Sequence, residues 1–336
     1  MRPAHRRIPR SRPTRATPHR RPPILEVVAL FLAAHALPAQ EAPAFTDPDR
    51  AAKVRALGPA AEAMFGDFFR ERDVPGLAWG VVLDGELILS GAFGSADLDG
   101  GVPADTRSLF RIASMSKSFT ALAILQLRDR GLLRLDAPAS DYLPEMEGLR
   151  LPTDDAPVIT VRNLLTHSAG FPEDNPWGDR QLADTDEELL ALVEDGISFS
   201  RAPGVAYEYS NTGFALLGQI VQRVSGMEFQ EYMRRHVFEP LGMDATVWEF
   251  EDAPAERLAL GYDRSDGDWV QVPHEHHGAF GAMGGLITSI EDFAAYAALH
   301  LSAWSPRDDP DEGPLRRSSL REMHQPATFS SLQPGY

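Results

Sequence analysis

The chain has 336 residues, 43% of them hydrophobic, and a formal net charge of −17. This length suits one large domain or two modest ones, and the composition excludes an intrinsically disordered chain. The sequence contains no cysteine, which excludes thiol catalysis, disulfide bonds and thiolate metal sites.

The charge is unevenly distributed along the chain. Residues 1–39 contain eight arginines and one acidic residue, Glu26, for a local charge of +7. Because the whole chain carries −17, residues 40–336 carry −24. Nucleic-acid binding needs an excess of basic side chains to neutralise phosphates, and residues 40–336 have an excess of acidic ones. We therefore expect no nucleic-acid partner.

The basic head is followed by a short apolar run, VVALFLAAHAL (Val27–Leu37), and then by small residues. This order is typical of a secretory signal peptide, here residues 1–39 with cleavage after Ala39. A DNA-binding basic arm is the alternative, and the apolar run argues against it. We therefore expect an exported protein, periplasmic or extracellular, with no stable membrane span after signal removal.

The first predicted elements of the remaining chain are a helix and a hairpin within residues 49–95. Residues 49–72 have helical spacing, and we expect an apolar face formed by Val54, Leu57, Ala61, Met64, Phe65 and Phe68. Residues 76–94 contain two β-rich runs joined by Asp84-Gly85, which is the strongest short-range signal for a β-hairpin.

Residues 110–336 are predicted to be mainly helical. One buried helix ends at Gly131, a short one has Thr160 as N-cap, another ends at Gly226, and a fourth has Ser289 as N-cap. No convincing later strand pair is expected. Because an isolated hairpin is marginal, this α+β layout lacks strands that the hairpin needs.

The chemistry of the sequence centres on FRIASMSKSFTALAIL (Phe110–Leu125), where a lysine opens an apolar helix. Ser114 and Lys117 are three residues apart, which places both side chains on one helix face near the positive end of its dipole. Burial there would lower the pKa of the lysine, so that it could activate the serine as a nucleophile. On spacing alone, a Ser114 N-cap and a solvent-facing Lys117 remain the favoured alternative.

A second motif changes that balance. Tyr209-Ser210-Asn211 precedes the helix that ends at Gly226, and a tyrosine can act as a general base while an asparagine amide can hold a substrate amide. A buried tyrosine with an asparagine N-cap is the structural alternative. An S-x-x-K motif followed by Y-x-N about a hundred residues later is the pattern of penicillin-recognising serine enzymes.

The segments around Ser114 and Tyr209, with ITVRNLLTHSAG and GAMGGLITSIEDFAAYAALHL, resemble the serine β-lactamase-related family over about residues 50–325. This family groups class C β-lactamases, D-alanyl-D-alanine carboxypeptidases and esterases. The resemblance implies an antiparallel sheet flanked by helices, plus an all-helical subdomain. It implies Ser114 as the acylated nucleophile, Lys117 as its activating partner, Tyr209 as general base and acid, and Asn211 as a substrate-binding residue. A small-molecule or peptidoglycan-like substrate and no cofactor are expected.

The sequence departs from the family pattern in one respect. The family has a third motif, Lys or His, then Thr or Ser, then Gly, on a strand after the Gly284–Leu286 segment, and no such triplet follows here. We therefore expect residues 40–336 to form a single domain whose C-terminal strands are missing. A catalytically inactive truncated or binding form of the same scaffold stays open as the alternative.

Two histidine features were weighed as further candidates. His274, His276 and His277 form a cluster with possible zinc-ligand spacing, but a solvated loop is the expected reading and no metal site is predicted. His167 would be a useful base if it faced Ser114, whereas its place at a helix C-terminus favours a structural role.

Overall fold

The computed structural model describes residues 46–175 and 178–330. The predicted signal peptide lies outside these residues. No helix among the residues described is both long and apolar enough to cross a membrane.

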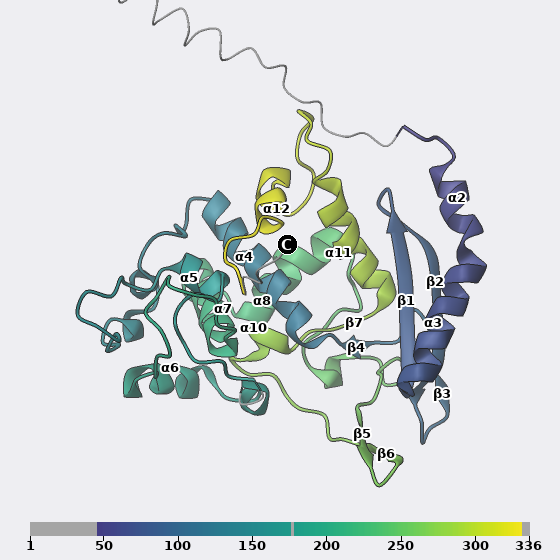
Figure 1. Cartoon of the computed structure of the whole chain (residues 1–336), viewed down its shortest axis with the longest axis horizontal. Coiled ribbons are helices and arrows are strands. Elements are labelled where there is room, and N and C mark those ends of the chain that lie inside the picture. The colour runs from purple at the N-terminus through teal and green to yellow at the C-terminus, as the bar shows by residue number, and fades with distance from the viewer. Residues whose placement is uncertain (1–45, 176–177, 331–336) are drawn as a thin grey trace, which may run out of the picture. The chain divides into compact units, whose positions relative to one another are not determined.

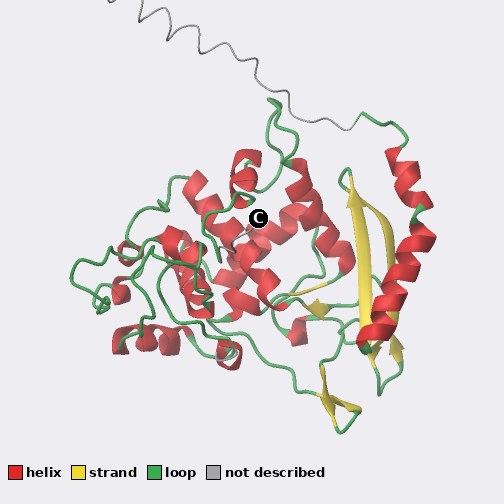
Figure 2. Ribbon diagram, in the orientation of Figure 1, coloured by secondary structure: helices red, strands yellow, loops and turns green. Residues whose placement is uncertain are grey.

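The chain begins with two helices and a three-stranded antiparallel sheet (Figures 1 and 2). α2 (Arg50–Ala56) and α3 (Gly58–Arg72) precede β1 (Gly76–Leu83), which pairs along its length with β2 (Glu86–Asp97). The short β3 (Val102–Pro103) then pairs with the end of β2. The turn between β1 and β2 is Asp84-Gly85, and both residues have positive φ, as a two-residue hairpin requires. The predicted hairpin is thus confirmed.

Two helices pack on opposite faces of this sheet (Figure 1). On one face α3 stacks Phe65 on Trp79, with ring centroids 4.6 Å apart, and Phe69 on Phe93. On the other face lies α11 (Ile290–Ser302), and it comes so close that a Cβ on Gly80 would lie 2.8 Å from Ile290 Cγ2. Glycine at position 80 therefore allows the close contact between β1 and α11.

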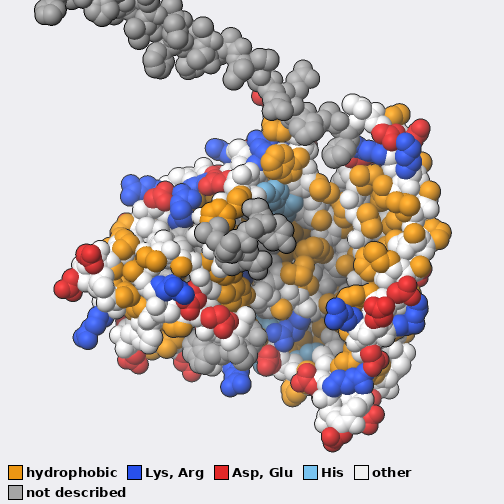
Figure 3. Space-filling model, viewed as in Figure 1, with side chains coloured by type: hydrophobic (Ala, Val, Ile, Leu, Met, Phe, Trp, Pro, Cys, Tyr) orange, Lys and Arg blue, Asp and Glu red, His pale blue; other side chains and the backbone are white. Residues whose placement is uncertain are grey.

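The apolar face predicted for residues 49–72 is only partly right. Leu57, Met64 and Phe68 are 59%, 60% and 44% exposed, and hydrophobic side chains accordingly gather over α2 and α3 in Figure 3. Val54, Ala61 and Phe65 of the predicted face are half-buried, and Phe65 contacts the sheet. Phe69, which the prediction left out, contacts the sheet beside it.

Two further strand pairs correct the expectation that no later strands occur. β4 (Phe110–Arg111) pairs with β7 (Ile287–Thr288), and β5 (Tyr262–Ser265) forms a hairpin with β6 (Asp268–Gln271). Among the described residues, β1 is an edge strand of its sheet and has β2 as its only pairing partner. A groove of about 560 Å³ runs between β1 and α11, lined by Val82, Leu87 and Phe293 among others (Figure 3).

Helices are the main regular elements of the rest of the described chain. Its α-helices are α4 (Ser116–Asp129), α5 (Val161–Leu165), α6 (Asp186–Asp195), α7 (Asn211–Ser225), α8 (Phe229–Met233), α9 (Glu239–Leu241), α10 (Gly281–Gly284) and α12 (Arg317–Met323). Short 3-10 turns span Ala113–Met115, Ala139–Asp141, Pro144–Met146, Gly178–Gln181 and Phe250–Asp252, and a π-helical turn spans Arg234–Phe238.

The hydrophobic core is built around α4 and α7. Phe119, Leu122 and Ile124 on α4 and Leu216 and Ile220 on α7 have no exposed surface. α4 and α7 both lie against α10, so the core fixes the relative positions of three segments that are distant in sequence. The predicted caps are confirmed: Thr160 and Ser289 cap α5 and α11, and Gly226 follows α7 with a positive φ.

Candidate active site

Ser114 lies in the 3-10 turn that leads into α4, and its side chain is exposed. The preceding residue, Ala113, has φ of 46°, in the left-handed region that alanine rarely occupies. Backbone contacts hold the turn from both sides, because Ile112 donates to the carbonyl of Leu286 and the N–H of Leu286 donates to Ser116 Oγ. The serine is therefore presented on a strained but well-supported turn.

Lys117 is 7% exposed and points back toward this turn. Its Nζ donates to Ser114 Oγ at 3.1 Å, to Asn211 Oδ1 at 2.7 Å and to the carbonyl oxygen of Met283 at 2.7 Å. An ammonium has three N–H donors, and these three oxygen acceptors match them in number, with Met283 Sδ also 3.8 Å from Nζ. The solvent-facing lysine of the structural alternative is not what the fold produces.

Tyr209 lies on the other side of Ser114. Its hydroxyl is 2.6 Å from Ser114 Oγ, and the ammonium of Lys117 lies 4.8 Å from the centre of its ring. The ring of Tyr209 thus faces the ammonium, while its hydroxyl faces Ser114. The structure thus brings Ser114, Lys117 and Tyr209 together, as the sequence predicts.

Asn211 is the first residue of α7 and is fully buried. Its amide oxygen accepts from Lys117, and its amide nitrogen donates to Asn175 Oδ1 at 2.6 Å. It does not cap its helix, since Ser210 is the N-cap through a bond from Gly213 N–H. The predicted contact of Asn211 with substrate stays a prediction, because Asn175 holds its nitrogen in this structure.

Two further groups in the site were not found by sequence reasoning. Asp174 accepts from the N–H groups of Asn211 and Thr212 at 2.6 and 2.7 Å, which satisfies the first amides of α7. The carbonyl of Met283 on α10 is the second. Neither gives a sequence signal, because one is an ordinary loop carboxylate and the other is a backbone atom.

His167 lies behind Tyr209 rather than in contact with Ser114. Its ring stacks on the ring of Tyr209 at 4.6 Å, and its Nδ1 accepts from the N–H of Ser210 at 3.1 Å. Burial, with a contribution from the charge of Lys117, lowers the pKa of His167 to about 4. His167 is therefore a neutral imidazole at neutral pH.

The three clustered histidines have separate surroundings. His274 stacks on Phe250, while His277 is 4% exposed and burial lowers its pKa to about 4. His276 places Nδ1 at 3.1 Å from Glu249 and Nε2 at 3.6 Å from Glu251.

His276, Glu249 and Glu251 form a group that could hold a metal ion. Both carboxylates precede the histidines by more than twenty residues, so the local sequence around the histidines does not indicate them. Each nitrogen of the imidazole faces a different carboxylate.

Comparison with known proteins shows the family to which the chain belongs. A family model described as Beta-lactamase matches residues 60–335. The chain belongs to the beta-lactamase family. The match includes Ser114, Lys117, Tyr209 and Asn211, and it confirms the family resemblance of the sequence.

The relatives within the beta-lactamase family carry several names. Esterase EstB of Burkholderia gladioli is 35% identical over 246 residues, which cover 66% of this chain and 61% of that protein. Penicillin-binding protein 4* of Bacillus subtilis (strain 168) is 32% identical over 188 residues, which cover 53% of this chain and 40% of that protein. The chain therefore spans about 40% to 61% of the length of these curated relatives.

Solved structures of beta-lactamase relatives support the same α+β fold. The octameric penicillin-binding protein homologue from Pyrococcus abyssi is 28% identical with a TM-score of 0.66, covering 79% of this chain and 59% of that one. A class C beta-lactamase at 23% identity has a TM-score of 0.63, with coverage of 74% and 65%, and this likeness concerns the fold alone.

Proposed function

We propose that the chain is a serine hydrolase that forms an acyl-enzyme on Ser114. The observation that carries this proposal is the position of Ser114 Oγ, 2.6 Å from the Tyr209 hydroxyl and 3.1 Å from Lys117 Nζ. A nucleophile within hydrogen-bond reach of a base, which is itself next to a cation, is the arrangement that covalent catalysis needs. Family membership supports the hydrolase class.

The proposed reaction begins with proton transfer from Ser114 to the phenolate of Tyr209, which the ammonium of Lys117 stabilises. Ser114 Oγ then bonds to the substrate carbonyl carbon, and the backbone N–H of Ser114 supplies one oxyanion donor. The bond to the leaving group breaks as the Tyr209 phenol returns its proton to that group. Water, deprotonated in turn by Tyr209, attacks the acyl ester and releases Ser114 with its proton.

The proposed substrates are esters, β-lactams or D-alanyl amides. The names of the relatives include an esterase, penicillin-binding proteins and beta-lactamases, so they do not choose among these classes. All three contain a carbonyl carbon that the same serine can attack.

A non-catalytic binding form of the scaffold is the second candidate. It is favoured by Asn211, whose amide nitrogen donates to Asn175 rather than facing an open position. In such a form a ligand would meet Ser114 and Tyr209 without acylation.

Active-site labelling separates the two candidates. We expect a fluorescent penicillin or a fluorophosphonate to label the wild type, with the added mass on the peptide that contains Ser114. Ser114→Ala should abolish this labelling, while Ser118→Ala, in the same segment, should keep it because Ser118 bonds to Met115 and Tyr296 instead. Labelling that persists in Ser114→Ala, or none in the wild type, contradicts the proposal.

We also propose that the protein is exported, which rests on the basic and apolar order of residues 1–39. Expression of the whole chain in a bacterium with an intact export pathway should give a periplasmic or secreted product that begins at residue 40. N-terminal sequencing of that product tests this, and an uncleaved cytoplasmic product argues against it.

A further inference from the structure

His167 contacts the predicted general base and the residue that follows it. Its ring stacks on Tyr209 with an interplanar angle of 28°, and its Nδ1 accepts from the backbone N–H of Ser210. Its own carbonyl accepts from the N–H of Glu208 at 2.8 Å. One residue therefore holds the segment 208–210 at three points, on both sides of the Tyr209 side chain.

The backbone of His167 is held in an uncommon conformation. Its φ is 52°, in the left-handed region, which only a few per cent of residues other than glycine adopt, histidine among the more frequent of them. Strain of this kind persists only where the surroundings enforce it, and it concentrates at functional sites.

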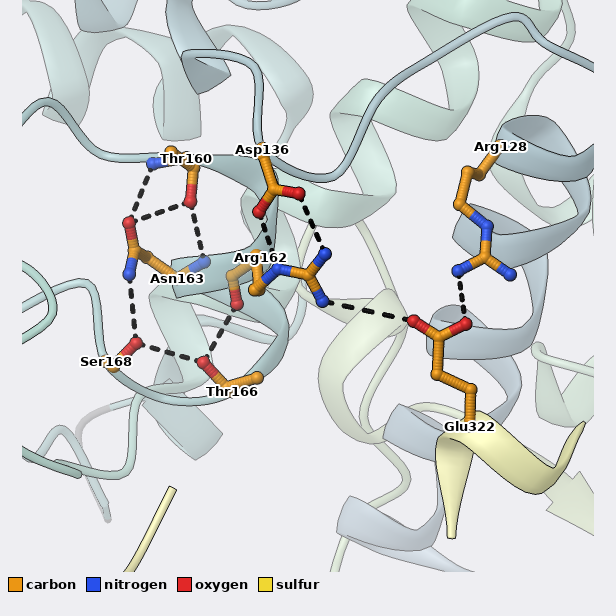
Figure 4. Close-up of polar contacts among 8 residues, drawn as sticks. All are labelled: Arg128, Asp136, Thr160, Arg162, Asn163, Thr166, Ser168 and Glu322. Atoms are coloured by element: carbon orange, nitrogen blue, oxygen red, sulfur yellow. Dashed lines mark hydrogen bonds and ion pairs between the residues drawn. The ribbon is translucent and has the colours of Figure 1, made fainter. Parts of the chain in front are cut away.

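The polar contacts that enforce this turn are shown in Figure 4. The hydroxyls of Thr166 and Ser168, on either side of His167, are 2.9 Å apart. Asn163 donates to Ser168 Oγ at 3.1 Å and completes a capping box with Thr160. Nearby, Arg162 pairs with Asp136 at 2.6 Å and with Glu322 of α12 at 3.9 Å. The fold thus fixes the turn independently of the His167 side chain.

The hydrogen bond to Ser210 requires a neutral His167 ring. A nitrogen that accepts from a backbone N–H must keep its lone pair, so the proton of the neutral ring is on Nε2. The charged groups that act on the ring are Lys117 from α4 and Asp174 from the loop between α5 and α6, and its other neighbours are the rings of Tyr207, Tyr209 and Phe214. A protonated His167 would lose its bond to Ser210 and add a second cation beside Tyr209.

We propose that His167, as a neutral imidazole, is a positioning residue that fixes the hydroxyl of Tyr209 against Ser114. This inference rests on the proposed function. His167 acts through Tyr209 and takes no proton from Ser114. Its two contacts are separable: the ring supports the face of Tyr209, and Nδ1 holds the backbone at Ser210.

Two variants of His167 test the two contacts, and a variant of His274 is their control. His167→Phe keeps a ring but has no acceptor, and His167→Asn keeps an acceptor and suits positive φ but has no stacking ring. Since small misplacements of a catalytic group cost up to about a hundredfold in rate, we expect His167→Phe to label at Ser114 about tenfold to a hundredfold more slowly. His274→Phe is the matched control, because His274 stacks on Phe250 at the same 4.6 Å, and it should label at the wild-type rate.

A double-mutant cycle separates positioning from a merely structural role. If His167 acts through the hydroxyl of Tyr209, His167→Phe in a Tyr209→Phe background should slow labelling by less than about twofold further. Multiplying losses in the double variant, or a wild-type rate for His167→Phe, would overturn the inference. Failure of the proposed function looks different, because the wild type would then show no labelling that Ser114→Ala removes.

Discussion

Ala113 and His167 share a backbone conformation that few residues of their kind adopt. Five described residues other than glycine have a positive φ, and the other three are aspartates: Asp73, Asp84 and Asp266. Aspartate and histidine are enriched in this region, whereas alanine enters it rarely. Ala113 stands immediately before Ser114 and His167 stands against Tyr209, so two of these five residues lie at the candidate active site.

Replacing Ala113 by glycine tests whether this strain matters. Left-handed alanine costs about 1–2 kcal/mol, and the extra freedom of glycine in the unfolded chain costs about 0.4–1 kcal/mol. We therefore expect the free energy of unfolding to be unchanged or to rise, by up to about 1.6 kcal/mol, in urea denaturation.

The same variant should be a poorer enzyme. A glycine allows the turn to leave the geometry that presents Ser114, so we expect labelling of Ala113→Gly to slow about tenfold. Asp266→Gly is the control, since it relieves a positive φ in the β5–β6 turn and should label normally. A variant of Ala113 that is both more stable and equally reactive would show that the strain has no catalytic role.

At the scale of elements, the two hairpins show what sequence patterns can predict. Both use an Asp-Gly turn, at residues 84–85 and 266–267. The first was predicted because its strands are apolar and β-rich. The second was missed because its strands, YDRS and DWVQ, are mostly polar and exposed, so that the turn is their main signal.

The helix starts show which contacts a local sequence pattern predicts and which it does not. Thr160 and Ser289 were predictable caps, because each is a hydroxyl residue ahead of an apolar periodic run. At α7 the first amides bond to Asp174, 37 residues upstream of Asn211, and no local pattern reports such a partner. The same holds for the Met283 carbonyl that receives Lys117, which α10 brings from 166 residues away.

At the scale of the whole molecule, the candidate site is assembled from contacts between residues that lie up to 166 positions apart in the sequence. Spacing alone placed Ser114 and Lys117 on one face but could not choose between a nucleophile and a helix cap. The family resemblance predicted that Tyr209 would meet them, and the core between α4, α7 and α10 is the physical reason that it does. Packing of this kind is decided by the complete fold, which local propensity does not report.

Three histidines connect the stability of the molecule to pH. Burial is the main cause that lowers the pKa of His167, His277 and His300 to about 4, from an ordinary value of 6.5. These histidines are therefore protonated below about pH 6.5 in the unfolded chain, but only near pH 4 in the folded chain. It follows that folding stability is unaffected by these groups above pH 6.5 and falls as the pH is lowered from 6.5 toward 4.

His277 offers the sharpest test of this dependence, because it is 4% exposed and neither ring nitrogen has a hydrogen-bond partner within the described residues. At 1.36 kcal/mol per pH unit, its share of the stability lost between pH 6.5 and pH 5 is about 2 kcal/mol. His277→Leu should keep that share, and removing an unpaired buried polar group should not weaken the fold at pH 7.5. Urea unfolding at pH 7.5 and pH 5 measures both effects, with His274→Leu as a control that retains His277 and should remain as acid-sensitive as the wild type. Equal losses in His277→Leu and the wild type would mean that His277 is not held neutral by its burial.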